Sequence, residues 1–96
     1  MDVFATLADP TRRRMLDMLA MREFTAGELV EAFPGVSQPT ISQHLKVLRE
    51  AKLVTVRADA QRRIYTLRPE ALREVDNFIA RYRKFWESRP TRTRTP

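Results

Sequence analysis

The segment from Ser37 to Glu50 gathers side chains with hydrogen-bonding ends, namely Gln38, Thr40, Ser42 and Gln43. Hydroxyl and amide groups of this length can bond to the edges of DNA bases, and glutamine can pair with adenine through two hydrogen bonds. The ring of Pro39 or the methyl group of Thr40 can contact a thymine methyl group. The chemistry that this segment favours is therefore base recognition.

A helix must hold these side chains on one face, and the sequence predicts one. Ser37 is suited to cap its first turn, where Pro39 is tolerated because the N–H that proline lacks is not needed there. An apolar stripe follows the i, i+4, i+7 rule at Ile41, Leu45 and Leu48. The opposite side of the helical wheel holds Pro39, Gln43, Lys46 and Glu50, with Thr40, Ser42 and Val47 beside them.

Positive charge is concentrated around this helix. The chain has 96 residues and a net charge of +6; residues 37–68 carry seven Lys and Arg against two acids, whereas residues 1–36 carry four against six. A surface that faces phosphates needs this distribution, although a solvated basic face would show it too. Lys46 and Arg49 are candidates for phosphate contacts. His44, the only histidine, is expected to contact DNA or to flank the core.

Three shorter helices are expected before this one. The first covers residues 2–8, and the second begins at Asp9-Pro10 and runs to about Met21. Thr25 and Glu28 form a capping box that opens a third helix, which extends over Phe33. Pro34-Gly35 ends it. Two short helices joined by a tight turn, the second with a polar outer face, are typical of a helix-turn-helix.

A β-hairpin is expected after Ala51. The residues 53–57 and 64–67 are rich in strand formers, and Ala58-Asp59-Ala60-Gln61 lies between them. This predicts a two-stranded wing with a basic tip. Its arginines would hold the DNA backbone or enter the adjacent minor groove, and they are Arg57, Arg62 and Arg63.

The C-terminal part predicts one last helix that opens at Pro69. Its apolar stripe is Leu72, Val75, Ile79, Tyr82 and Trp86, widened by Phe78 and Phe85. Such a surface is more than a chain of this size is expected to cover, so we expect a homodimer that pairs this helix; intramolecular core is the alternative. We place one domain at residues 1–87 and a disordered basic tail at residues 88–96.

Composition excludes several classes of protein. The chain has no cysteine, which rules out disulfides and thiolate metal sites. Catalysis is not expected, since there is no glycine-rich phosphate loop and His44 has no triad partner. No apolar run reaches membrane-spanning length and the first residues lack a signal-peptide core, so no membrane association and a cytoplasmic location are expected.

Three segments together resemble the ArsR/SmtB family of bacterial winged-helix repressors. They are residues 7–16 (Leu-Ala-Asp-Pro-Thr-Arg-Arg-Arg-Met-Leu), 37–49 and 62–67, and with their spacing the resemblance covers about residues 3–86. It implies a dimer built from the first and last helices, and hence an interface of Phe4, Leu7, Val75, Phe78, Ile79, Tyr82, Phe85 and Trp86. It also implies binding to double-stranded operator DNA, with repression relieved by an inducer or protein partner that the sequence leaves unidentified.

The chain departs from this family in two respects. The positions that hold metal ligands in many members fall on Pro69, Ala71, Tyr82 and Phe85, none of which suits zinc, so no metal or other cofactor is expected. The usual glycine after the DNA-reading helix is replaced by Lys52. If the helix ends in the left-handed conformation, lysine there costs about 1 kcal/mol.

The sequence thus predicts a mainly α fold with a small β-hairpin, a winged helix-turn-helix of about five helices and a two-stranded wing. The predicted function is that of a dimeric, sequence-specific repressor that does not respond to metals. A sequence-independent architectural DNA binder and a winged-helix module for protein contacts are the alternatives. The predicted DNA contacts are Ser37, Gln38, Pro39, Thr40, Ser42, Gln43, His44, Lys46, Arg49, Arg57, Arg62 and Arg63.

Overall fold

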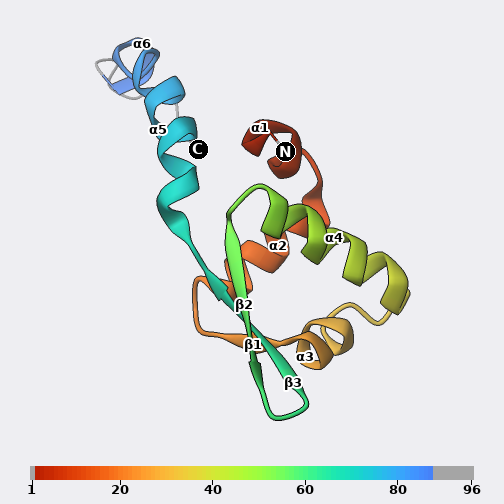
Figure 1. Ribbon diagram of the computed structural model, residues 1–96. Helices are drawn as coiled ribbons and strands as arrows, with labels where there is room; N and C mark the ends of the chain where they lie inside the picture. Colours follow the sequence, from red (N-terminus) through yellow and green to blue (C-terminus); the bar gives the residue numbers. More distant parts are fainter. Residues whose placement is uncertain (1, 88–96) are drawn as a thin grey trace.

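A computed structural model describes residues 2–87, and Figure 1 shows how its elements follow one another. The N-terminal half is helical except for one short strand, and a hairpin separates it from the last helices. The elements in chain order are α1 (Val3–Leu7), α2 (Pro10–Leu19), β1 (Phe24–Thr25), α3 (Ala26–Glu31), α4 (Gln38–Glu50), β2 (Val54–Asp59), β3 (Arg62–Leu67), the 3₁₀ turn η1 (Pro69–Leu72), α5 (Arg73–Ala80) and α6 (Lys84–Glu87).

The core lies where α2, α3 and α4 meet the inner end of the sheet. Its fully buried apolar side chains come from these helices and from the residue just before β2, and are Met15, Leu29, Ile41, Leu48 and Leu53. Leu45 is almost fully buried, so the predicted stripe of α4 is confirmed. Val47, which the helical wheel placed beside the outer face, is buried as well. Each such side chain contributes about 1.5–3 kcal/mol relative to an exposed one.

The helices begin where their capping residues predict. The side chain of Asp9 accepts hydrogen bonds from the N–H groups of Thr11 and Arg12, at 2.8 and 3.2 Å. Both bonds of the capping box are present, since Glu28 N donates to Thr25 and Thr25 N donates to Glu28. Two predicted ends are wrong: α2 stops at Leu19 rather than Met21, and α3 at Glu31, two residues before Phe33.

The sheet has three strands rather than two, in the order β1-β3-β2. The strand β1 was not predicted, because it is only two residues long and is defined by its pairing, Phe24 with Tyr65 and Thr25 with Ile64. The hairpin of β2 and β3 is confirmed, but its strands pair as far as Asp59 and Arg62. The loop is therefore only Ala60 and Gln61, and Ala60 takes the left-handed conformation with φ 58°.

The single last helix that the sequence predicts is interrupted, so the described residues contain six α-helices instead of five. Its first turn, η1, is a 3₁₀ helix. After Ala80 the N–H groups of Tyr82 and Arg83 bond to the carbonyls three residues earlier, which tightens the backbone and separates α5 from α6. Arg83 pairs with Asp76 on one side of this break and with Glu87 on the other.

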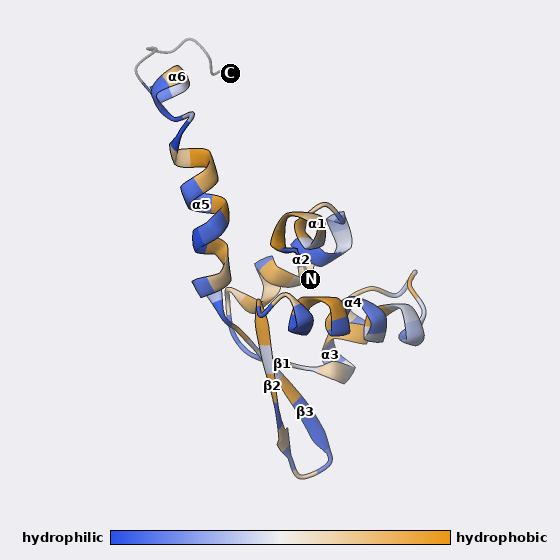
Figure 2. Ribbon diagram, turned by 45° about the horizontal axis from the view of Figure 1, so that its top comes forward, coloured by the Kyte–Doolittle hydropathy of each residue, from blue (hydrophilic) through white to orange (hydrophobic). Residues whose placement is uncertain are grey.

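The helices α5 and α6 project from the body as an arm, as Figures 1 and 2 show. The molecule measures 52 × 25 × 22 Å, with a radius of gyration of 16.1 Å. A compact chain of this length has about 12–13 Å. No residue of either helix is buried. The predicted tail, residues 88–96, lies outside the described residues.

The end of α4 shows what replaces the family's glycine. Leu53 N donates to Leu48 O at 3.0 Å and Lys52 N donates to Arg49 O at 2.9 Å, which is the Schellman pattern. Lys52 occupies the left-handed position with φ 63°. Lysine thus adopts the conformation that favours glycine, and the predicted steric cost applies.

We predict that Lys52→Gly stabilises the fold. Removing the Cβ from a left-handed residue should raise the free energy of unfolding by about 1 kcal/mol and the melting temperature by about 4–8 °C. Glu50→Gly, in the helix itself, should lower stability by a similar amount and serves as the control. Thermal unfolding followed by circular dichroism measures both, and a lower melting temperature for Lys52→Gly would contradict the argument.

Candidate nucleic-acid interface

The outward face of α4 is polar and open to solvent. All of its predicted contact residues except His44 are exposed, namely Ser37, Gln38, Pro39, Thr40, Ser42, Gln43, Lys46 and Arg49. The N-terminal end of α4 lies at the side of the body opposite the arm (Figure 1), and residues 37–40 at this end are exposed. An exposed helix end of this kind can enter a groove of DNA.

The first turn of α4 contains two kinds of side chain. Ser37 caps the helix by accepting from Thr40 N at 3.3 Å, and its hydroxyl donates to the Thr40 hydroxyl at 2.9 Å. Ser37 and Thr40 therefore already have partners within the turn. Gln38 and Gln43 form no side-chain hydrogen bond with any of residues 2–87 and keep their full capacity for an outside partner.

His44 is placed differently from the other predicted contacts. It is half-buried, and its Nδ1 accepts a hydrogen bond from Arg12 Nη1 at 3.2 Å. Nε of the same arginine donates to the carbonyl of Thr6 at 2.8 Å. The Arg12 side chain thus joins α1 to α4, which gives His44 a role in fixing α4.

Lys46 and Arg49 supply positive charge on the same helix. Neither forms an ion pair with an acid in the part of the chain that the structure describes. Arg49 lies in the last turn of α4, where it lines a cavity of about 500 Å³ together with Lys52 and Arg68. Lys46 is thus nearer than Arg49 to the free N-terminal end that carries Gln38.

The three wing arginines have different surroundings. Arg57 donates to both carboxylate oxygens of Glu23, at 2.8 and 3.2 Å, and Thr66 also donates to Glu23 at 3.0 Å. Arg62 pairs with Asp59 at 2.8 Å. Arg63 is exposed and has no ion pair within residues 2–87, so it is the most available of the three for a phosphate.

Glu23 is a residue that sequence reasoning missed. The hydrogen bonds from Arg57 and then from Thr66 lower the pKa of Glu23, and the same contact raises the pKa of Arg57. The pair therefore persists at neutral pH and is lost only as acid protonates Glu23. The role of Glu23 was missed because β1 was not predicted. The pairing of β1 with β3 places Glu23, the residue before β1, at the edge of the sheet beside β3.

Apolar side chains are exposed on α1 and along the arm. Rings of Phe4 and Phe78 meet edge to face with centroids 5.5 Å apart, and Phe78 and Tyr82 lie 5.4 Å apart. Six of the eight predicted interface residues are more than a third exposed, namely Phe4, Phe78, Ile79, Tyr82, Phe85 and Trp86. Leu7 and Val75 are half-buried against the core, so part of their apolar surface is covered within the protomer, as the alternative of an intramolecular core predicts.

Two further observations concern metals and membranes. Among residues 2–87 no group of three or more His, Cys, Asp and Glu side chains is placed to hold a metal ion. No helix in that range is long and apolar enough to cross a membrane.

The arrangement of α3, α4 and a β-wing defines a winged helix-turn-helix, and comparison with known proteins agrees. A family model described as a helix-turn-helix domain matches residues 7–57. The transcriptional repressor SdpR of Bacillus subtilis is 35% identical over 84% of this chain and 89% of its own. Two crystal structures are similar. That of an ArsR family transcriptional regulator has 28% sequence identity and a TM-score of 0.79, and the match covers 92% of this chain and 90% of the other. That of a "possible transcriptional regulator for arsenical resistance" has 42% sequence identity and a TM-score of 0.74, and the match covers 90% of this chain and 85% of the other.

The chain therefore belongs to the ArsR/SmtB-type family of winged helix-turn-helix transcription regulators. The resemblance that the sequence suggested is confirmed. Its class is that of DNA-binding transcriptional regulators.

We predict that Glu23→Gln strengthens DNA binding. The substitution releases Arg57 from its carboxylate partner, so affinity for any duplex should rise about two- to fivefold and the salt slope should steepen by up to about one unit. Glu31→Gln is the matched control, because it removes the same charge from an exposed residue without a wing arginine as partner. Fluorescence anisotropy at several salt concentrations measures both. Equal effects of the two substitutions would show that Arg57 does not contact DNA.

Proposed function

We propose that this regulator is a dimeric, sequence-specific repressor that binds double-stranded operator DNA in the cytoplasm and does not respond to metals. The observation that carries the proposal is the free N-terminal end of α4, where Gln38 and Gln43 are exposed and make no side-chain hydrogen bond within residues 2–87. In helix-turn-helix proteins this part of the helix touches bases. SdpR is named a transcriptional repressor, which supports the direction of regulation.

In the proposed complex each protomer inserts α4 into a major groove. Gln38 and Gln43 bond to base edges, and Pro39 offers an apolar surface to a thymine methyl group. Ser37, Thr40, Ser42 and Lys46 face bases or the adjacent phosphates. The hairpin tip lies along the backbone, where Arg63 contacts a phosphate directly and Arg57 and Arg62 must first exchange their carboxylate partners.

We predict that Gln38→Ala and Arg63→Ala weaken binding in different ways. Loss of a base contact at Gln38 should cost about 1–3 kcal/mol on the selected site and relax sequence preference there. Loss of a phosphate contact at Arg63 should weaken selected and random duplexes by similar factors and lower the salt slope by about one unit. Anisotropy titrations on both duplexes, after selection of bound sites from random DNA, give these numbers.

Each outcome separates the proposal from its alternatives. If Gln38→Ala weakens random DNA as much as the selected site, α4 does not read sequence and the protein is an architectural binder. If selection yields no preferred site and no duplex binds, the winged helix serves protein contacts instead. If Arg63→Ala changes neither the affinity nor the slope, the wing is not a DNA contact.

The proposal of a dimer rests on the exposed apolar side chains of the arm. A helix whose residues are all at least partly exposed gains little stability within one protomer, whereas its aromatic rings would be buried against a second copy. The ring contact between Phe4 and Phe78 makes α1 and α5 one continuous surface. That continuity favours pairing through both helices.

We predict that the protein sediments as a dimer at tens of micromolar and that Ile79→Glu combined with Tyr82→Glu makes it monomeric. Twofold symmetry places each new charge in the interface twice, so repulsion and desolvation both oppose pairing. Met21→Glu is the control, since Met21 is 83% exposed, follows α2 in the chain and is not one of the proposed interface residues. Circular dichroism must show that the double variant stays folded. A monomeric wild type would end the proposal of a dimer.

Indifference to metals is proposed from the residues at the family's ligand positions. Pro69 and Ala71 lie in η1, Tyr82 follows α5 and Phe85 lies in α6, and none offers an imidazole, thiolate or carboxylate. Micromolar zinc, cadmium or arsenite should leave operator affinity unchanged in anisotropy titrations. Release of DNA by stoichiometric zinc would contradict this.

A further inference from the structure

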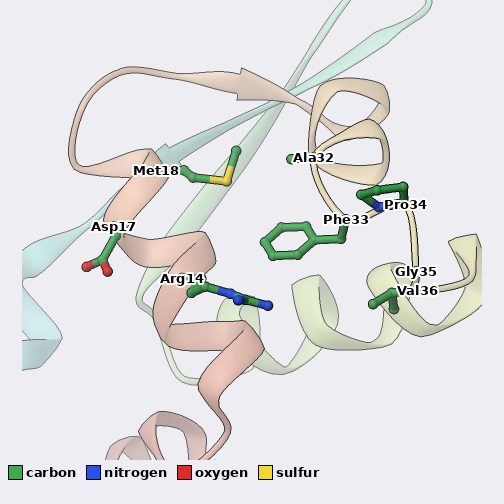
Figure 3. A pocket seen from close by; sticks show the side chains of 8 residues that line it. All are labelled: Arg14, Asp17, Met18, Ala32, Phe33, Pro34, Gly35 and Val36. Atoms are coloured by element: carbon green, nitrogen blue, oxygen red, sulfur yellow. The ribbon is translucent and has the colours of Figure 1, made fainter.

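A pocket of about 570 Å³ lies between α2 and the turn that joins α3 to α4. Figure 3 shows its lining, which comes from one face of α2 and from the residues just before α4. None of these residues belongs to the DNA contacts or the dimer surface proposed above. They are Arg14, Asp17, Met18, Ala32, Phe33, Pro34, Gly35 and Val36.

The pocket has an apolar floor and one inward cation. Phe33 is only 7% exposed, and the guanidinium carbon of Arg14 lies 5.5 Å from the centre of its ring. In Figure 3 the side chains of Arg14 and Met18 extend toward Phe33, whereas the carboxylate of Asp17 points away. Of the two charged side chains that line the pocket, the positive one therefore lies beside the apolar floor.

Arg14 differs from its neighbours in the same helix. Arg12 donates to the Thr6 carbonyl, and Arg13 donates to the Leu7 carbonyl at 2.6 Å. Arg14 forms no ion pair with any acid in the described range, and its guanidinium lies over the Phe33 ring. A guanidinium has five donors in a planar fork that suits a carboxylate, and its position beside apolar surface strengthens such a pair.

We propose that this pocket is an effector site for a small aromatic carboxylic acid. The ring of the ligand packs on Phe33 and Met18, and its carboxylate pairs with Arg14. An anion is favoured over an amine because the Arg14 guanidinium lies against Phe33, whereas the Asp17 carboxylate, although Asp17 also lines the pocket, points away from that ring. The proposal names the chemical class of the inducer, and its effect on DNA rests on the proposed operator binding.

The pocket wall ends at Val36, just before the cap of α4. The turn is closed by Val36 N, which donates to Phe33 O at 2.9 Å, and Ser37, the cap of α4, comes next in the chain. A ligand held between α2 and this turn displaces the end of α4 that carries Gln38. Because a ligand shifts an equilibrium only by its differential affinity, the acid must bind the free protein more tightly than the DNA complex.

Binding can be tested without DNA by methyl NMR of the full chain labelled at methionine. Titration with 2-naphthoate should shift the Met18 methyl signal saturably, through the ring current of the probe. Met15, which is fully buried, and Met21, which is 83% exposed, are internal controls that should not move. Absence of a saturable Met18 shift at millimolar 2-naphthoate would overturn the site.

The charge of the ligand and of Arg14 can then be varied separately. The neutral isostere 2-naphthamide should bind the wild type at least about tenfold more weakly than 2-naphthoate, and Arg14→Gln should weaken 2-naphthoate by a similar factor. Arg13→Gln removes the same charge one residue away and should leave the Kd of 2-naphthoate within twofold, about experimental error. Equal binding of acid and amide, or no effect of Arg14→Gln, would show an apolar groove rather than an acid site.

Saturating 2-naphthoate should weaken the affinity of the wild type for its selected duplex by at least about fivefold, and should not do so in Arg14→Gln. If Met18 shifts and DNA affinity does not change, the effector role is overturned. If no duplex is bound at all, the proposed function fails while the Met18 titration still decides the site.

Discussion

The burial of one stripe of α4 is the constraint on which the rest of the structure depends. Ile41 and Leu48 are fully buried and Leu45 nearly so, which fixes the rotation of α4 about its own axis. The Schellman end at Lys52 then fixes where the helix stops, since Leu48 and Leu53 are both buried there. With rotation and end both set, Gln38 and Gln43 have no position except the outer face. The exposure of these polar side chains is thus a consequence of packing, and truncation of Ile41 or Leu48 to alanine would cost about 2–5 kcal/mol.

Positive charge alone does not decide which side chains are available to DNA. Arg57, Arg62 and Arg63 belong to one hairpin, yet two of them are held by carboxylates. The partner of Arg57 is Glu23, whose pKa is lowered by the hydrogen bond from Arg57, so the pair favours the carboxylate anion. A phosphate must compete with that carboxylate, whereas at Arg63 it competes only with water. Neighbouring acids therefore determine how available each wing arginine is to a phosphate, and the tertiary structure determines which acids are neighbours.

Local signals predicted much of this fold, and contacts distant in sequence account for what was missed. The caps at Asp9, Thr25 and Ser37 act within three or four residues, so the sequence displays them directly. The strand β1 exists through its pairing with β3, and Glu23 meets Arg57 across 34 positions of sequence. Flanking the core was one of the two expectations for His44, but its contact with Arg12 joins residues 32 positions apart, and the sequence did not show it. The break after Ala80 was missed for a different reason, because the apolar stripe continues through it.

One chain of contacts joins the exposed arm to α4. Phe78 of α5 packs on Phe4 of α1, and the carbonyl of Thr6 at the end of α1 accepts from Arg12. The same guanidinium donates to His44 of α4. Because α1 is only five residues long, these contacts span a short and compact element. In the proposed dimer, this connection would set the separation of the two α4 helices, and twofold operator half-sites lie about one helical turn of DNA apart. A change at the arm would then reach the DNA through α1, whereas an acid bound beside Arg14 would reach α4 from its other end.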